Sequence, residues 1–175
     1  MKRKISILTT LLIFITPTIL AQTSMKEYKV GHVIYVSIPD YMTKTVGLND
    51  AAVIQFKNSV KDIAGIIIDD NKGELEIANM KYASINDFYD DFIKDFLIKE
   101  KKRSVSQPNY QTIGENKIVD CDVTYYDKDS KMDIYYFIGI VETKDSFYKL
   151  ICWGTLESKD KYKADFQKIL YSIKN

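Results

Sequence analysis

The chain has 175 residues, and its 25 basic and 24 acidic side chains nearly cancel. This balance argues against a nucleic-acid-binding groove and against a basic membrane-binding patch, because both need a positive excess. Apolar residues make up 46% of the chain, while the seven glycines and three prolines are few, which excludes disordered and low-complexity proteins.

The first 21 residues have the pattern of a cleaved secretory signal. Lys2, Arg3 and Lys4 form a basic start, residues 5–15 are an almost continuous apolar run, and Ala21 offers a small residue at the cut position. The run is too short for a comfortable membrane span, although an uncleaved signal anchor is the alternative. We expect cleavage after Ala21, export to the periplasm or outside the cell, and no integral membrane span in the mature chain.

The mature chain, residues 22–175, is predicted to be one domain. Its length of about 154 residues suits a single hydrophobic core. Residues 28–38 predict one strand, which Pro39 ends. Residues 51–57 and 63–69 predict two more strands, and the polar residues between them predict a hairpin loop. A helical turn is expected around residues 74–78.

The clearest helix is predicted for residues 84–102. Ser84 is a good N-cap, and Asp87 three residues later resembles the acidic partner of a capping box. Apolar residues recur at three- and four-residue spacing: Ile85, Phe88, Tyr89, Phe92, Ile93, Phe96 and Leu97. The basic run at residues 99–103 is either a patch for an anionic partner or the solvated end of the helix, where cations offset the macrodipole. We favour the helix end.

Residues 117–155 predict three consecutive strands, which form an antiparallel meander because the turns at residues 127–131 and 142–145 are short. A short strand at residues 110–113 folds back onto the first of them. Ser158 is a plausible N-cap for a final helix with an apolar stripe over residues 162–173. This order of elements predicts an α+β fold in which helices flank an antiparallel sheet of about six to seven strands.

Two cysteines remain in the mature chain, Cys121 and Cys152. Export would permit a disulfide. On the first and third strands of a simple meander, however, they would lie about 9.5 Å apart, across one intervening strand. Bridged cysteines need Cα atoms within about 7 Å. We favour two free, buried thiols. A different strand order could bring the two cysteines close enough for a disulfide.

The sequence carries few residues suited to catalysis or metal binding. His32 is the single histidine, so a serine or cysteine triad would have to use it as base, and its place in an alternating strand favours a structural role. Asp127 and Asp129 have calcium-ligand spacing, but the following residues lack the required ligand and glycine, so a solvated turn is favoured. We predict no catalytic residue, no metal ligand and no cofactor.

Aromatic residues are abundant: 13 tyrosines, eight phenylalanines and one tryptophan. Adjacent aromatics on the predicted meander must point to opposite faces of the sheet. Some rings are therefore exposed unless helices cover both faces, and exposed tyrosine is typical of recognition surfaces. Cross-strand packing is the alternative for each ring. The candidate interaction residues are Tyr126, Tyr135 and Tyr148.

Several segments together resemble a known group of domains. They are IPD at residues 38–40, LNDAAVIQF at 48–56, INDFYDDFIKDFL at 85–97, the tyrosine-rich meander, and DFQKILYSIK at 165–174. Their order is similar to that of the PsbP-like group, which shares an α/β/α sandwich with the photosystem PsbP proteins and the Mog-type Ran-binding proteins. The resemblance implies this fold and a non-enzymatic, protein-binding role, often at a membrane surface. No binding residue of the group can be matched here.

These observations favour an exported, non-catalytic binding module that docks on a protein partner at the cell envelope. The alternative is a carrier or sensor that holds a small apolar molecule between the helix at residues 84–102 and the sheet. An enzyme that uses carboxylates or a bound metal is a third hypothesis, with Asp127 and His32 as the residues to test.

Overall fold

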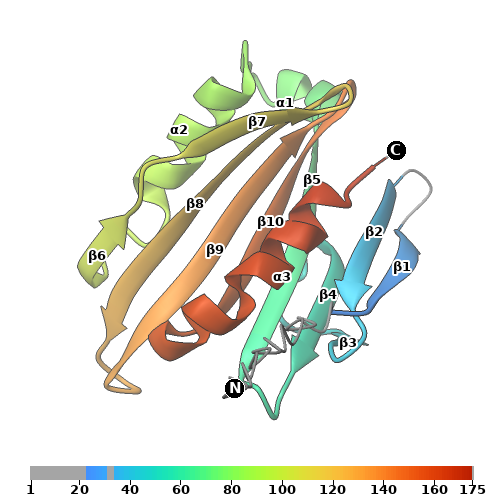
Figure 1. The fold of residues 1–175 in the computed structure, drawn as a ribbon. Helices are drawn as coiled ribbons and strands as arrows, with labels where there is room; N and C mark the ends of the chain where they lie inside the picture. The colour runs from blue at the N-terminus through green and yellow to red at the C-terminus, as the bar shows by residue number, and fades with distance from the viewer. Residues whose placement is uncertain (1–22, 31–33, 175) are drawn as a thin grey trace, which may run out of the picture.

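The computed structural model describes residues 23–30 and 34–174, and within them the chain forms ten strands and three α-helices (Figure 1). The strands are β1 (Met25–Val30), β2 (Ile34–Pro39), β3 (Thr43–Thr45), β4 (Ala52–Asn58), β5 (Ile63–Asn71), β6 (Lys101–Val105), β7 (Asn109–Ile113), β8 (Asn116–Asp127), β9 (Met132–Glu142) and β10 (Ser146–Thr155). The helices are α1 (Lys72–Ile77), α2 (Ile85–Asp95) and α3 (Lys159–Tyr171), and a short 3-10 helix at Leu156–Ser158 precedes α3. The predicted signal at residues 1–21 and His32 lie outside the described residues.

Eight strands form one antiparallel sheet in the order β3-β4-β5-β10-β9-β8-β6, and β7 also pairs with β8. The predicted meander is confirmed, because β8 pairs with β9 and β9 with β10. The α+β class is confirmed as well. The prediction of six to seven strands is lower than the eight observed, because β3 has only three residues and because the basic residues at the start of β6 fit the end of the predicted helix.

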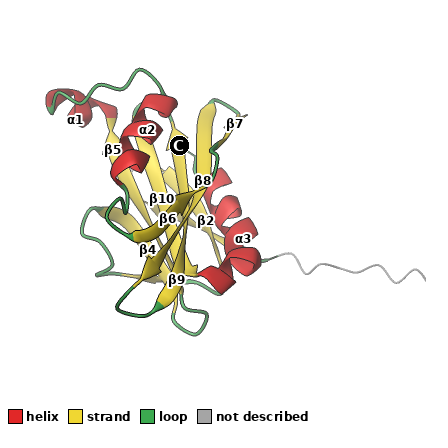
Figure 2. Cartoon of the chain, turned by 90° about the vertical axis from the view of Figure 1, so that its left-hand side faces the viewer, coloured by secondary structure: helices red, strands yellow, loops and turns green. Residues whose placement is uncertain are grey.

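The sheet separates two hydrophobic cores. On one face, α3 and the β1–β2 hairpin cover a core that includes Phe137 and Phe166; on the other, α2 covers a core that includes Ile138 and Phe88. Figure 2 shows the sheet between α2 and α3. Neighbouring residues of β9 enter different cores because side chains alternate along a strand. We call these the α3 face and the α2 face.

The single strand predicted at residues 28–38 is wrong. The structure has two antiparallel strands there, β1 and β2, with Tyr28 paired to Val36. They form a separate two-stranded sheet, and β2 joins the end of the chain through hydrogen bonds between Tyr35 and Lys174. Val30 of β1 and Ile34, Val36 and Ile38 of β2 are buried and all have even numbers, so the sequence reads as one alternating strand.

The predicted helix at residues 84–102 begins correctly and ends too late. Ser84 accepts a hydrogen bond from the Asp87 N–H, as predicted, but α2 ends at Asp95 and Leu97 has a left-handed φ of 56°. Residues 101–105 then return as β6. From there Arg103 donates to the carbonyl oxygens of Phe96 (2.8 Å) and Ile93 (2.5 Å). Arg103 of the basic run therefore pairs with carbonyl groups at the end of α2 from the neighbouring strand β6, and the run is not part of the helix.

Both cysteines are free and buried, as favoured from the sequence. Cys121 on β8 belongs to the core under α2, whereas Cys152 on β10 belongs to the core under α3. They point to opposite faces of the sheet and are separated by β9. A disulfide between them would require the sheet to be dismantled.

Candidate functional site

Two of the three predicted interaction residues are buried under the α3 face. Tyr135 is 0% exposed and Tyr148 is 2% exposed. The hydroxyl of Tyr135 donates to the Asp122 carboxylate at 2.9 Å. These two residues therefore cannot contribute to a surface of the folded domain, because α3 and the β1–β2 hairpin cover the face to which they point.

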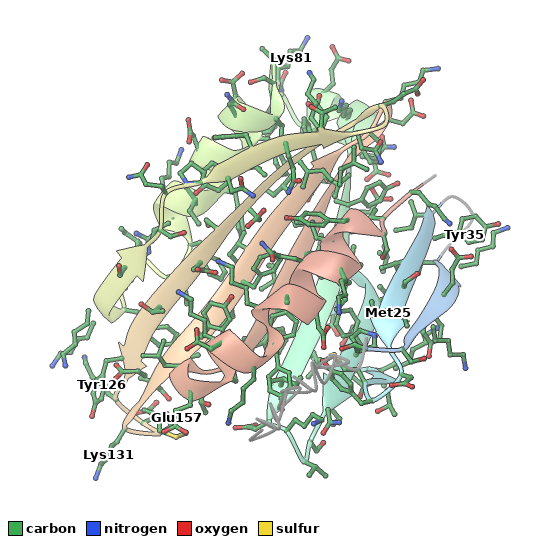
Figure 3. The ribbon with its side chains drawn as sticks, viewed as in Figure 1. Met25, Tyr35, Lys81, Tyr126, Lys131 and Glu157 are labelled. Atoms are coloured by element: carbon green, nitrogen blue, oxygen red, sulfur yellow. The ribbon has the colours of Figure 1, made fainter. Side chains whose placement is uncertain are left out.

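Tyr126 lies near the end of β8 and is partly exposed (Figure 3). The Lys102 ammonium group lies 5.1 Å from the centre of its ring. A contact between Tyr126 and a partner stays a prediction.

The partly exposed aromatic residues of the meander gather on the α2 face. Tyr125 on β8, Tyr136 on β9 and Trp153 on β10 follow one another across the strands. The ring centres of Tyr136 and Trp153 are 6.0 Å apart, and those of Tyr125 and Tyr136 are 6.2 Å apart. Phe96, just after α2, meets Tyr136 edge-on at 5.4 Å. We call these four residues the aromatic row.

The fold leaves the aromatic row partly uncovered because α2 is short. α2 buries Ile85, Phe88 and Tyr89 from its first half against the sheet, while Phe92 near its end and Phe96 just after it are only partly buried. The register that places Tyr136 opposite Trp153 sets the row beside that end. The row is the candidate site, and the α2 face rather than the α3 face carries it.

The phenol groups of the aromatic row are uncharged at neutral pH. Burial, followed by the neighbouring Tyr125, raises the pKa of Tyr136 to about 12. Burial and nearby acidic residues also raise the pKa of Tyr125. The row thus offers broad, rigid rings with neutral hydroxyl groups, a combination that occurs often in protein interfaces.

A charged cluster that sequence analysis missed fastens α3 to β8. Asp122 is 6% exposed, and its carboxylate lies 3.0 Å from Lys159 and 2.7 Å from Lys163. Burial raises the pKa of Asp122, but the hydrogen bonds from Lys163, Lys159 and Tyr135 outweigh it, so the pKa lies below its usual range. These contacts join β8 to β9 and α3, which indicates a structural role.

The acidic turn at residues 127–131 is the solvated hairpin turn that was favoured. Asp127 accepts hydrogen bonds from the backbone N–H groups of Asp129 (3.2 Å) and Ser130 (3.1 Å). Across residues 23–30 and 34–174, no group of three or more His, Cys, Asp or Glu side chains is placed to hold a metal ion. The same residues contain no helix with the length and apolarity to cross a membrane.

Side chains fill the centre of the interface between α2 and the sheet. The alternative function, a carrier of a small apolar molecule, would place its ligand in this interface. Phe88 of α2 stacks on Phe147 of β10 with ring centres 4.3 Å apart. A concavity of about 220 Å³ lies beyond this stack, between α1 and β10, lined by Leu75, Met80 and Tyr82 among others. Pockets for small ligands usually enclose about 300–1,000 Å³. The space is small for such a ligand.

Structural comparison identifies the fold. The solution structure of the cyanobacterial PsbP protein CyanoP from Synechocystis sp. PCC 6803 matches with a TM-score of 0.62 and 10% identity, over 89% of this chain and 94% of that one. The chain has the PsbP/Mog-like fold. A point mutant of Mog1 matches with a TM-score of 0.62 and 12% identity, over 86% of this chain and 95% of Mog1.

A third structure with this fold is LpqN from Mycobacterium tuberculosis, described as involved in cell envelope biogenesis. It matches with a TM-score of 0.53 and 9% identity, over 88% of this chain and 92% of LpqN. No family model matches the chain, and no curated protein matches it. At these identities the likeness establishes the PsbP/Mog-like fold that the sequence resemblance implied, and it assigns no activity.

Proposed function

We propose that this protein is an exported, non-catalytic binding module that docks on an envelope-associated protein through the aromatic row. The row is the observation that carries the proposal. Its rings are held by the strands and by one another, so docking costs little side-chain entropy, and their exposed edges lose water on contact. The signal pattern of residues 1–21 supports export.

The description of LpqN supports an envelope setting by analogy, because that protein shares the fold and is involved in envelope biogenesis. The alternative, a carrier of a small apolar molecule, is weakened by the Phe88–Phe147 stack inside the helix–sheet interface. Within the described residues, an enzymatic role has no cluster of metal-binding side chains to support it.

Site-specific photo-crosslinking tests the proposal. A photoreactive phenylalanine analogue replaces Tyr125 in the full-length protein, which is expressed in its own host and irradiated. We expect a covalent adduct with a second polypeptide, because the row would lie within the interface. The matched control carries the analogue at Ile77, which is 84% exposed on α1.

A polypeptide adduct at position 125 and not at position 77 supports the proposal. Equal adducts at both positions, or none at position 125, would contradict it. Circular dichroism and thermal unfolding of both proteins check that the fold is kept.

A further inference from the structure

The outer edge of β7 is an open, uncharged strand edge. β7 runs antiparallel to β8, and no strand of residues 23–30 or 34–174 pairs with its other side. Apart from the β7–β8 ladder, no backbone hydrogen bond of β7 is found in the described part of the chain. Tyr110 is 44% exposed and Ile113 is 41% exposed, so the edge is accessible.

The register identifies the backbone groups that point outward. Ile113 and Asn116 flank a two-residue turn, in which Gly114 has a left-handed φ of 61°. The pair that closes such a turn is hydrogen-bonded, and hydrogen-bonded and non-bonded pairs alternate along the ladder. Tyr110 and Thr112 therefore direct their N–H and C=O groups away from β8.

The other edge strands of the eight-stranded sheet, β3 and β6, are protected against added strands. β3 has only three residues and carries Lys44. β6 carries Lys101, Lys102 and Arg103, and its pairing with β8 shifts register between Lys101 and Ser104. Charge, bulges and short length are the usual protections of an edge strand. The β7 sequence, NYQTI, has none of these charges.

Concavities flank the β7 edge on both sides of the sheet. The one on the α2 side, about 270 Å³, is lined by Ile85, Thr112 and Lys117 among others. The one on the α3 side, about 350 Å³, is lined by Ile113, Tyr171 and Lys174 among others. Side chains of an added strand alternate between the two faces, so each concavity can take one set of them.

The charge near the turn end of β7 indicates what an added strand should carry. Lys117 lies opposite Thr112 in the ladder, its side chain is 59% exposed, and the nearest carboxylate oxygen, of Glu142, is 3.7 Å away. This contact is an ion pair, but Glu142 also pairs with Lys72 at 2.9 Å, so two lysines share one carboxylate. The exposed Lys117 can therefore also meet an acidic side chain or a terminal carboxylate. A strand without charged residues, with Lys117 in one flanking concavity and Lys174 in the other, suits an extended segment with an acidic end.

We propose that β7 accepts an extended segment of a partner protein as an additional strand, with an acidic group beside Lys117. The backbone of Tyr110 and Thr112 supplies the ladder hydrogen bonds, and the two concavities select the alternating side chains. This surface is distinct from the aromatic row, because β7 lies at the sheet edge beyond β8 while the row lies on the face of β8, β9 and β10.

A displayed library of random eight-residue peptides, selected on the wild-type protein, tests the proposal. Binding of each enriched peptide is then measured on Thr112→Pro and Thr112→Val. Proline removes the outward N–H and is tolerated on edge strands, whereas valine keeps that N–H. We expect at least tenfold weaker binding to Thr112→Pro, unchanged binding to Thr112→Val, and weaker binding of acidic peptides to Lys117→Glu.

Failure to enrich any peptide, or equal binding to the proline and valine variants, overturns the proposal. A wild-type dimer in light scattering that Thr112→Pro converts to a monomer also overturns it, because a second copy would then occupy the edge. Thermal unfolding verifies that all three variants fold. The photo-crosslinked adduct at position 125 should still form in the Thr112→Pro variant. The proposal for the aromatic row and the proposal for the β7 edge can therefore fail independently.

Discussion

Asp122 shows how one buried carboxylate can connect two elements that are distant in the sequence. Its side chain accepts hydrogen bonds from Tyr135 of β9 and Lys163 of α3, and lies 3.0 Å from Lys159. The nearby Asp120 is also buried, and it accepts hydrogen bonds from Asn109 of β7 at 3.0 Å and from Tyr171 of α3 at 3.3 Å. Because buried carboxylates are costly without partners, these contacts fix the position of α3 on the sheet.

Asp122→Asn is predicted to lower the free energy of unfolding at pH 7 by about 2 kcal/mol, because charge-assisted hydrogen bonds to the two lysines are lost. The native pKa of Asp122 is depressed, so its stabilisation is present above the unfolded pKa and disappears as pH falls through the native value. Urea unfolding between pH 7 and pH 2.5 should therefore show the difference from wild type shrinking in acid.

The exposed Asp90 of α2 provides the control, since Asp90→Asn should change the free energy of unfolding little at any of these pH values. A constant difference between wild type and Asp122→Asn down to pH 2.5 would contradict the assigned ion pairs. The pKa of Asp165 is also lowered, so the free energy of unfolding of Asp122→Asn should still fall somewhat in acid.

Sequence alternation located the aromatic residues but could not rank their exposure. It placed Tyr135 and Tyr136 on opposite faces, which is correct. Which face a helix covers more completely depends on where α2 ends and where α3 docks, and neither is encoded in the strand itself. For that reason Tyr135 and Tyr148 were chosen from the sequence, while the partly exposed Tyr125, Tyr136 and Trp153 were not.

At the scale of elements, α3 can approach the sheet closely because β9 has glycine at position 139. A Cβ built there would lie 2.5 Å and 2.6 Å from the two terminal methyl carbons of Leu170. Real contacts of this kind do not occur, so the buried Leu170 side chain, α3 or the sheet must shift if a side chain is added at position 139.

Gly139→Ala is therefore predicted to destabilise the protein by about 2 kcal/mol, the usual cost of overpacking. Leu170→Ala should also destabilise, by about 3 kcal/mol, through the cavity it leaves. The double variant should lose less stability than the sum of the losses in the two single variants, because the small side chain at position 170 makes room for the new methyl group. Chemical denaturation of the wild type, the two single variants and the double variant gives the coupling energy between positions 139 and 170. Additive losses of stability would show that this contact does not limit how closely α3 packs on the sheet.

Element types were more predictable from sequence than their ends. The N-cap Ser84 and the apolar spacing fixed the start of α2. Its end was misplaced because Lys101, Lys102 and Arg103 fit a helix terminus as well as an edge strand. The hydrogen bonds from Arg103 to Phe96 and Ile93 favour the edge strand over the helix terminus. They exist only in the folded chain and cannot be seen in the sequence.

At the scale of the whole molecule, the central pairing joins segments far apart in the sequence. β10 lies between β9 and β5, with Cys152 opposite both Phe137 and Gly65. Turn lengths predicted the β9–β10 pair, but no local signal predicts the β5–β10 pair, since about 75 residues separate the strands. This pairing completes the sheet that carries both the aromatic row and the β7 edge.

The two proposed surfaces lie on different parts of the sheet. The aromatic row uses the α2 face near the end of α2, and β7 uses the far edge next to β8. One partner could therefore reach both surfaces, or two partners could bind together, and linked sites of this kind gain apparent affinity when the geometry permits both contacts.

The most direct test of the binding module is a native mass spectrum of the protein, purified gently from the envelope fraction of its own host. We predict a species with the added mass of a second polypeptide, lost in a Tyr125→Ser/Trp153→Ser variant that still folds. A bare wild-type monomer would contradict the proposed docking, and a small-molecule adduct in place of a polypeptide would favour the carrier.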